Sequence, residues 1–282
     1  GSYAMRLNST GAQNTAVGDH ALKSNTTASF NTAIGQGAML ENTTGARNMA
    51  IGANAYQNSD TESDNMAIGY NAMLTNTAGG IQNIGIGNYA LDGLTSGDSN
   101  VAIGYNAMSA TVTGGQNTAV GNSAMEVLTS GARNVAVGYV ALDALTTGSY
   151  NIAIGFEALT TNSTGGNNIA IGKSALEANT GGSAMAIGFE AGLANIDGQI
   201  IAIGYQCMAA NTTGTRNIAI GSNAYDSSDT ENDNIAIGHN AMTTNTAGGT
   251  TNIAIGNYVL DALTSGDSNV GVGDNALSAL AT

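Results

Sequence analysis

The chain has 282 residues, of which 42% are hydrophobic and only 9% are charged, and it contains no proline and no tryptophan. Twenty acidic residues against six basic ones give a formal net charge of −14. This balance argues against nucleic acid as a partner, because a phosphate backbone needs a basic surface. The single cysteine excludes an intrachain disulfide, and no apolar stretch reaches the roughly 18 residues of a membrane-spanning helix, so we expect no membrane insertion by this segment.

The first residues, "GSYAM", are interpreted as a cloning remnant. Residues 1–13 are therefore expected to be this remnant and a short lead-in. Residues 14–282 are expected to form a single repeat domain, because one motif recurs through nearly all of them.

That motif has the form Asn-x-Ala-Ile-Gly and returns about every 17 residues. Its closing glycine occurs at Gly18, Gly35, Gly52, Gly69, Gly87, Gly104, Gly121, Gly138, Gly155, Gly172, Gly188, Gly204, Gly221, Gly238, Gly256 and Gly273. The asparagine four residues earlier is replaced only at Ala184 and Ile200. Representative pairs of asparagine and glycine are Asn31 and Gly35, Asn48 and Gly52, Asn151 and Gly155, and Asn217 and Gly221.

Each repeat predicts one coil of a parallel β-solenoid, made of two short strands and two turns. The residues before the glycine alternate large, small, large, which is a strand pattern. A helix is not expected, because a glycine and a Thr/Asn/Gly run interrupt every repeat. About 17 residues are also too few for a crossover unit with a helix. The fold class is therefore all-β, a solenoid of about sixteen coils, in which the asparagines stack into a hydrogen-bonded ladder and each glycine forms a tight corner with positive φ or close backbone passage.

The strand also predicts an oligomer. Large side chains such as Met49 and Ile51 are expected to fill the coil, and the column of alanines represented by Ala50 to lie outside. Such a stripe would have an area on the order of 750 Å², more than a soluble monomer usually exposes. We therefore expect a homo-oligomer, with the chains side by side or intertwined. The opposite orientation of the strand, with the alanines inside, stays open at this point.

The sequences "NTAIG", "NVAIG" and "NIAIG", followed by x-x-Ala-Leu, resemble the head repeats of trimeric autotransporter adhesins. They also resemble related repeats of phage and prophage tail fibres. The resemblance covers about residues 14–277, and it implies a homotrimer of left-handed parallel β-rolls in an extracellular or virion fibre. The coil is longer than those of the adhesin heads, and neither a coiled-coil stalk nor a membrane anchor is visible. The longer coil with "AL…NTTG" favours the phage-fibre branch.

The expected function is that of a structural shaft or adhesive head segment of a phage tail fibre, which supports attachment to a host surface. The alternative is the head of a bacterial trimeric autotransporter adhesin at the cell surface, and a lesser one is an ice-binding solenoid. Ice binding lacks a regular threonine array, since threonine follows the asparagine only at Thr15, Thr32 and Thr118. The expected partners are further copies of the chain and a host-surface glycan or protein.

An enzyme is not expected. His20 and His239 are isolated, and the glycines introduce no helix that would form a phosphate loop. Cys207 replaces an alanine of the repeat and is expected to be a small buried side chain. Two acidic turns offer oxygen ligands at alternate positions, as calcium prefers: Asp60, Glu62, Asp64, Asp229, Glu231 and Asp233. Calcium is the only cofactor considered, and a solvated turn is the simpler alternative.

Six aromatic residues directly follow the repeat glycine: Tyr70, Tyr105, Tyr139, Phe156, Phe189 and Tyr205. Such a row either binds sugar rings or packs between rungs and chains. Arg47, Arg133 and Arg216 precede the repeat asparagine and are expected to pair with carboxylates across chains. Residues 48–107 match residues 217–276 at an offset of 169, which indicates a duplicated block. The coils at Ala184 and Ile200 are expected to interrupt the ladder and to be locally irregular.

Overall fold

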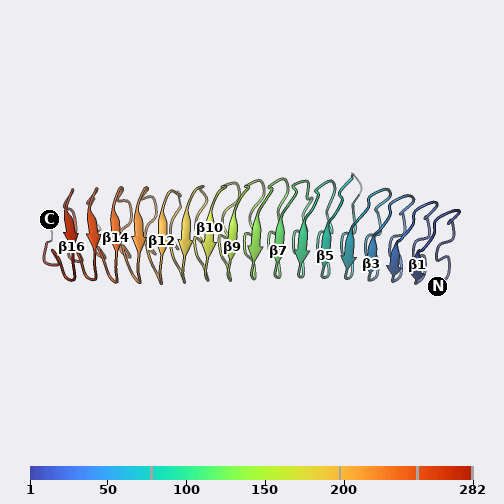
Figure 1. Cartoon of the computed structure of the whole chain (residues 1–282), viewed down its shortest axis with the longest axis horizontal. Coiled ribbons are helices and arrows are strands. Elements are labelled where there is room, and N and C mark those ends of the chain that lie inside the picture. The colour runs from blue at the N-terminus through green and yellow to red at the C-terminus, as the bar shows by residue number, and fades with distance from the viewer. Residues whose placement is uncertain (77–78, 197, 246–247, 281–282) are drawn as a thin grey trace. The chain divides into compact units, whose positions relative to one another are not determined.

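The computed structural model describes residues 1–76, 79–196, 198–245 and 248–280 (Figure 1). The predicted fold class is confirmed: the chain is an all-β parallel solenoid, with no helix among the described residues and hence none there that could cross a membrane. The chain divides into two compact units, Gly1–Thr147 and Gly148–Thr282. Each coil of a solenoid contacts only its neighbours, so no central core joins distant coils.

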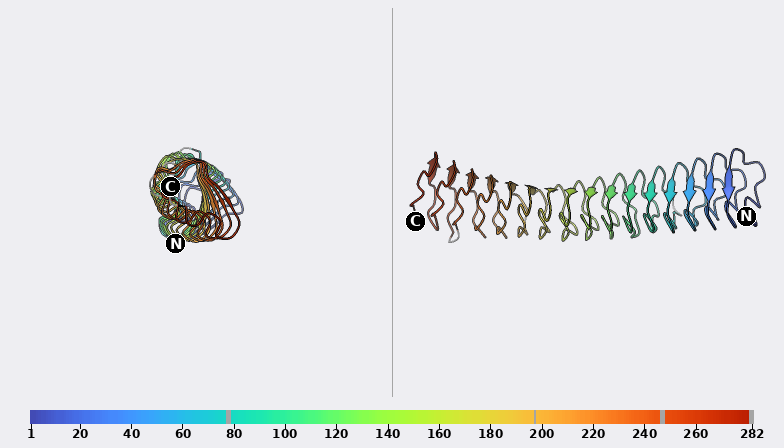
Figure 2. Two further views of the ribbon diagram at one scale, coloured as in Figure 1. Left: turned by 90° about the vertical axis from the view of Figure 1, so that its left-hand side faces the viewer. Right: turned by 90° about the horizontal axis from the view of Figure 1, so that it is seen from below.

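Unit 1 contains eight three-residue strands that pair in parallel and in chain order (Figure 2). They are β1 (Thr15–Val17), β2 (Thr32–Ile34), β3 (Met49–Ile51), β4 (Met66–Ile68), β5 (Ile84–Ile86), β6 (Val101–Ile103), β7 (Thr118–Val120) and β8 (Val135–Val137). Equivalent residues lie side by side, for example Ala33 beside Ala50. The in-register pairing places every repeat position in one column.

Unit 2 has the same organisation. Its strands are β9 (Ile152–Ile154), β10 (Ile169–Ile171), β11 (Met185–Ile187), β12 (Ile201–Ile203), β13 (Ile218–Ile220), β14 (Ile235–Ile237), β15 (Ile253–Ile255) and β16 (Val270–Val272).

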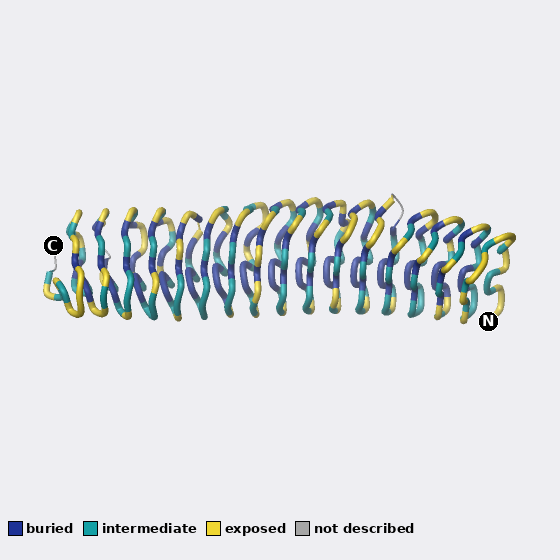
Figure 3. The backbone as a smooth tube through the Cα atoms, in the orientation of Figure 1, coloured by how far each residue is buried: buried dark blue, intermediate teal, exposed yellow. Residues whose placement is uncertain are grey.

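The faces of the strands are opposite to the expected ones. The central alanines, such as Ala33 and Ala50, are fully buried, whereas Ile34 is 39% exposed. The prediction that Met49 and Ile51 fill the coil was therefore wrong: both are only partly buried on the outer face. The interior is filled from the opposite side by the residue four positions after the glycine, for example Met39, and a small alanine leaves room for it. Figure 3 shows this alternation of buried and exposed segments in each coil.

The second expected strand of each coil is absent from the described residues, which form turns there. In the coil after β3, Asn54 and Tyr56 both have φ of 55°, and the same positions of nearly every coil have positive φ. Left-handed residues at alternate positions curl the chain instead of extending it. The large side chain, here Tyr56, nevertheless points into the core and is fully buried.

The corner glycines have both of the predicted properties, a positive φ and the close passage of another backbone. Gly35 has φ of 139°, and a Cβ there would lie 2.3 Å from the carbonyl oxygen of Gly52 in the next coil. No side chain fits such a contact.

Residues 1–13 form part of a coil and are not a separate lead-in. The amide of Met5 donates to the carbonyl of Ala21 at 3.0 Å, and the amide of Leu7 donates to that of Lys23 at 3.1 Å. The sequence signal was present, since Gly-Ser-Tyr-Ala-Met at residues 1–5 matches the Gly-x-x-Ala-Leu that begins at Gly18.

Candidate functional site

The repeat asparagine clips each coil to the next. The side-chain oxygen of Asn31 accepts from the backbone amide of Asn48 at 2.9 Å, and its side-chain nitrogen donates to the carbonyl of Gly45 at 2.8 Å. Asn217 makes the same two bonds in unit 2, to the amide of Asn234 and the carbonyl of Glu231. These asparagines are buried, so the ladder satisfies backbone groups that have no access to water. The predicted asparagine ladder is confirmed.

A second asparagine column was missed by the sequence analysis. It lies seven residues after the corner glycine, at the first letter of "NTTG", and its side chains are fully buried. Asn42 donates to the side chain of Asn25 at 3.3 Å, and Asn179 donates to that of Asn195 at 2.7 Å. In coils with "LTSG", leucine takes this position and is also buried. The alternation of asparagine and leucine at this position in most coils was the sequence signal of an interior column.

The coils at Ala184 and Ile200 lack the first ladder, as expected, but they are not irregular. β10, β11 and β12 keep their register, and Ser183 and Gln199 have the positive φ found before every repeat asparagine. The prediction of irregular rungs was wrong because the volume is conserved. Gly192 stands where other coils have a large residue, and the Cδ1 of Ile200 lies 3.2 Å from where its Cβ would be. Ile200 thus fills the space that Gly192 leaves.

The outer face of the strands is aliphatic. The first and third residues of nearly every strand are Ile, Val or Met, and both columns point away from the core. The more exposed residues of these columns include Ile103 in unit 1, at 37%, and Ile255 in unit 2, at 40%, and most of the others are partly exposed. A face about 10 Å wide and eight rungs tall has an area on the order of 380 Å² per unit, as large as the largest apolar patches of monomeric proteins.

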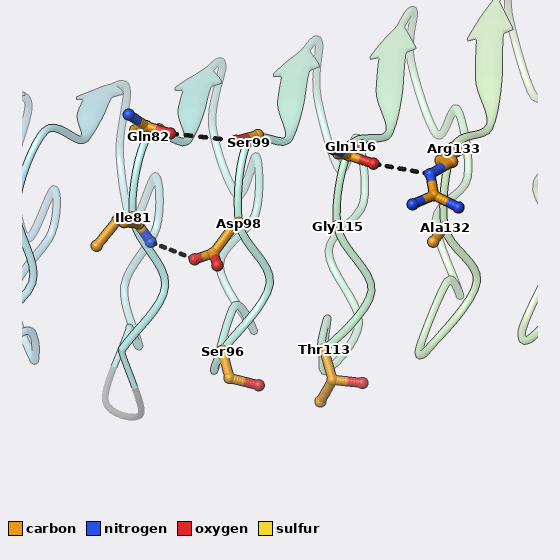
Figure 4. Close-up of a pocket in the computed structure, with 10 residues that line it drawn as sticks. All are labelled: Ile81, Gln82, Ser96, Asp98, Ser99, Thr113, Gly115, Gln116, Ala132 and Arg133. Atoms are coloured by element: carbon orange, nitrogen blue, oxygen red, sulfur yellow. Dashed lines mark hydrogen bonds between the residues drawn. The ribbon is translucent and has the colours of Figure 1, made fainter.

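A shallow groove runs beside this face in unit 1 (Figure 4). Polar side chains from successive coils line it and are bonded to one another. Arg133 donates to Gln116 at 2.9 Å, Ser99 donates to Gln82 at 3.4 Å, and the amide of Ile81 donates to Asp98 at 2.8 Å. These groups bond to one another along the groove. They therefore do not converge on a single point where one small ligand would bind.

The acidic turns do not assemble a metal site. Among the described residues, no three His, Cys, Asp or Glu side chains lie together as a metal ion requires. Asp60 accepts from Thr43, Glu62 turns inward to the amides of Asp60, Thr61 and Gly79, and Asp64 pairs with Arg47. The second turn repeats these contacts. Asp229 accepts from Thr212, Glu231 accepts from the amides of Asp229, Thr230 and Gly248, and Asp233 pairs with Arg216. The carboxylates therefore diverge, and the geometry gives calcium no support.

Next to each acidic turn lies a buried tyrosine that sequence reasoning did not single out. The hydroxyl of Tyr56 accepts from Asn65 at 2.7 Å and from Asn76 at 3.1 Å, and the hydroxyl of Tyr225 repeats this with Asn234 and Asn245. Burial raises the pKa of both phenols, so they stay neutral. The tyrosine reaches across the space that a serine, Ser59 or Ser228, leaves in the second column.

The aromatic residues pack differently in the two units. In unit 1, Tyr70 and Tyr105 meet through Tyr89, which was not predicted, in edge-to-face contacts of 5.5 and 5.8 Å. Tyr139 is 51% exposed. In unit 2, Phe189 and Tyr205 stack at 5.2 Å with an interplanar angle of 8°, and the Lys173 ammonium lies over the rings of Phe189 and Phe156 at 5.4 and 5.8 Å. Stacked rings cover each other's faces, which favours packing between rungs in unit 2 over stacking on sugars.

Arg47 and Arg216 each form an ion pair with an aspartate of their own chain. Arg47 bonds Asp64 at 2.5 and 2.7 Å, and Arg216 bonds Asp233 at 2.6 and 2.8 Å, each one coil further on. The guanidinium holds the pKa of Asp64 and of Asp233 below the ordinary value of an aspartate. Both pairs are exposed, so they contribute little to stability.

Cys207 is fully buried and free, as expected. Burial raises the pKa of its thiol to about 12, so the thiol is unreactive while the coil is closed.

No protein-family model, no curated protein and no solved structure matches this chain.

Proposed function

We propose that the chain is a structural segment of an attachment fibre, a shaft or adhesive head of the phage tail-fibre type, built as a homotrimer. The single observation that favours this most is the aliphatic outer face of the strands. It forms a continuous column within each unit, at the exposures seen in Ile103 and Ile255, and it is not covered by any other part of its own unit. A face of this kind is typical of a surface that packs against other chains.

The distribution of polar groups supports a structural role. The buried asparagines, the corner glycines and the interior columns all serve to join one coil to the next. The most distinctive polar cluster, around Tyr56, is buried and occurs a second time around Tyr225. A chain in which one arrangement is repeated many times extends a structure, and any binding by its surface is multivalent and weak at each coil.

The oligomeric state is the first test. Light scattering coupled to gel filtration is expected to give about three times the chain mass of 28.0 kDa. Ile103→Glu places a charge on the outer face and is expected to dissociate the trimer, whereas the matched control Gln116→Glu on the exposed polar column is expected to leave it intact. A stable monomer at micromolar concentration would remove the main argument for this function.

The second test addresses attachment. The isolated trimer is applied to a glycan array and to intact bacterial cells, and only weak, repetitive binding that depends on the trimer is expected. Tight binding of one defined ligand, lost when a single coil is changed, would identify a receptor-binding domain instead of a shaft.

A further inference from the structure

Two backbone amides of unit 2 have no hydrogen-bond acceptor among the described residues. At regular positions the amide donates to the asparagine of the preceding coil, as the amide of Ala184 does to Asn168 at 2.9 Å. Ala184 and Ile200 have no side-chain oxygen, so within the described part of the chain no acceptor meets the amides of Ile200 and Asn217. Both residues are about 99% buried, with exposed fractions of 1% each. A buried donor without a partner destabilises the closed state.

A third buried donor lies in the same coils. The side-chain nitrogen of Asn211 has no partner, because the next coil has the shorter Ser228 in this column. Among the described residues, Asn211 is the one asparagine whose buried side-chain nitrogen lacks a bond. Three unmet donors thus fall within 18 residues of chain, from 200 to 217.

The remaining bonds keep these coils closed. The strands stay in register, and the second asparagine column continues from Asn179 to Asn195 at 2.7 Å and from Asn195 to Asn211 at 3.2 Å. In this segment one asparagine column joins neighbouring coils, whereas at Asn25 and Asn42 both columns do. The coils have the regular shape with fewer bonds to hold it.

We infer that the junctions of β12 with β11 and with β13 are a built-in opening point, the place where unit 2 loosens first under heat or load. In a solenoid each junction opens with a free energy set by its own contacts, so a junction whose buried backbone amides lack acceptors opens more often than one whose amides are paired. The inference compares coils of one chain and does not depend on the proposed fibre function.

The single cysteine of the chain reports on this segment directly. Cys207 lies in the coil that follows Ile200 and is fully buried, so an aromatic disulfide reagent modifies it only when the coil opens. The double variant Cys207→Ala, Ala124→Cys moves the thiol to the same repeat position in unit 1, where Asn134 donates to Asn117 at 2.9 Å and the ladder is intact. At pH 8, native Cys207 is expected to react about tenfold faster than the thiol at position 124.

The inference is also tested by substitutions that restore the missing acceptors in unit 2 and by one that removes an acceptor in unit 1. Ala184→Asn supplies the acceptor for the amide of Ile200, and the pair Gly192→Leu, Ile200→Asn restores a regular coil with an acceptor for Asn217. Each is expected to slow modification of Cys207 severalfold. In the chain with cysteine at position 124, Asn100→Ala removes the acceptor of Asn117 and is expected to speed modification there. Equal rates for the two thiol positions, or repair variants that leave the rate at Cys207 unchanged, would overturn the inference.

Hydrogen exchange of the unmodified full chain gives an independent measurement. The amides of Ile200 and Asn217 are expected to exchange at least about tenfold faster than those of Ala184 and Asn234, which have the same position and an asparagine acceptor. Equal protection of the four amides would contradict the opening point without any mutation.

Discussion

Residues 48–107 of unit 1 and residues 217–276 of unit 2 are two versions of one block, and their differences separate what the fold requires from what it leaves free. Inside the coils, Tyr56 and Tyr225 have the same partners, and Glu62 and Glu231 accept the same backbone bonds. Outside, Tyr70 has become His239 and Tyr105 has become Asp274. The interior therefore tolerates little variation, while outward positions vary widely.

Where the two interiors do differ, the changes compensate. Ala90 and Ala102 of unit 1 correspond to Val259 and Gly271 of unit 2. A Cβ at Gly271 would lie 2.6 Å from the Cγ1 of Val259 in the preceding coil. The larger residue of one coil is thus matched by a smaller one in the next, which preserves the packing between them.

The largest effect is expected at the corner glycines, which are alike in both blocks. Gly52→Ala and Gly221→Ala would place a Cβ 2.2 and 2.3 Å from a carbonyl oxygen of the next coil. Each is expected to lower the free energy of unfolding by more than about 3 kcal/mol, measured from urea midpoints by circular dichroism. Gly79→Ala is the control, because Gly79 has φ of 103° but no atom within 4 Å of an added Cβ. Equal losses at Gly52 and Gly79 would mean that strain in φ, not contact between coils, sets the requirement.

The compensating pair predicts a coupling. Gly271→Ala alone is expected to cost about 1–3 kcal/mol by overpacking against Val259. In the Val259→Ala background the same substitution recreates the pair found at Ala90 and Ala102, and the cost is expected to fall sharply. A double-mutant cycle on unfolding free energies measures the coupling, and additive effects would show that the two positions are independent.

The buried tyrosines are expected to matter less. Tyr56→Phe removes one acceptor, but Asn65 still donates to the carbonyls of Ser63 and Gly80, and Asn76 still donates to Gly80. A loss of about 1 kcal/mol in unfolding free energy is expected, and Tyr225→Phe should match it because its partners are equivalent. Unequal losses would show that the two blocks are not energetically equivalent.

The same tyrosines predict an alkaline transition. Their pKa is raised in the folded chain, so their stabilising effect is complete below the pKa of an unfolded tyrosine, about 10, and is lost as the pH rises through and above it. Unfolding midpoints measured from pH 8 to 11 are expected to fall, and the double variant Tyr56→Phe, Tyr225→Phe should remove about half of the fall. Cys207, whose pKa is about 12, accounts for a remainder. An unchanged pH profile in the double variant would contradict this assignment.

The smallest effect is expected at the exposed ion pairs. Arg47→Ala and Arg216→Ala should leave the melting temperature unchanged within error at physiological salt. The pKa of Asp64 or Asp233 should nevertheless return upward to the ordinary value of an aspartate, as an NMR titration would show. A measurable drop in melting temperature would assign these pairs a structural role that their exposure does not suggest.

The sequence predicted the period, the parallel register, the ladder and the corner because each depends on one residue type at a fixed position. The roles of Asn48 and Gly52, for example, follow from the stacking of similar repeats alone. The direction of the strand faces was not decided, since Met49, Ala50 and Ile51 are all apolar and alternation alone does not say which set lies inside. Burial of the alanines depends on the narrow coil that Asn54 and Tyr56 create by adopting positive φ. Their residue types do not predict this backbone conformation.

The candidate sites were harder to predict for a related reason. The acidic turn suggested calcium because ligand-like spacing is visible in sequence, whereas the inward turn of Glu62 and the pairing of Asp64 with Arg47 depend on the adjacent coils. Tyr89 escaped notice because it lies one position later than Tyr70 and Tyr105 in its coil.

The asparagine clip is directional, and this gives every coil two chemically different ends. The side chain of Asn31 presents an oxygen and a nitrogen toward the following coil, which answers with the amide of Asn48 and the carbonyl of Gly45. Each coil thus presents an asparagine side chain on one side and the matching backbone amide and carbonyl on the other, and nearly all coils use the same pair of bonds. Insertion or deletion of whole coils keeps these bonds between neighbouring coils, whereas insertion or deletion of a few residues moves the asparagine away from its partners. The offset of 169 residues between the duplicated blocks, from Gly52 to Gly221, spans ten whole corner-to-corner steps, which is the kind of lengthening that such a connector permits.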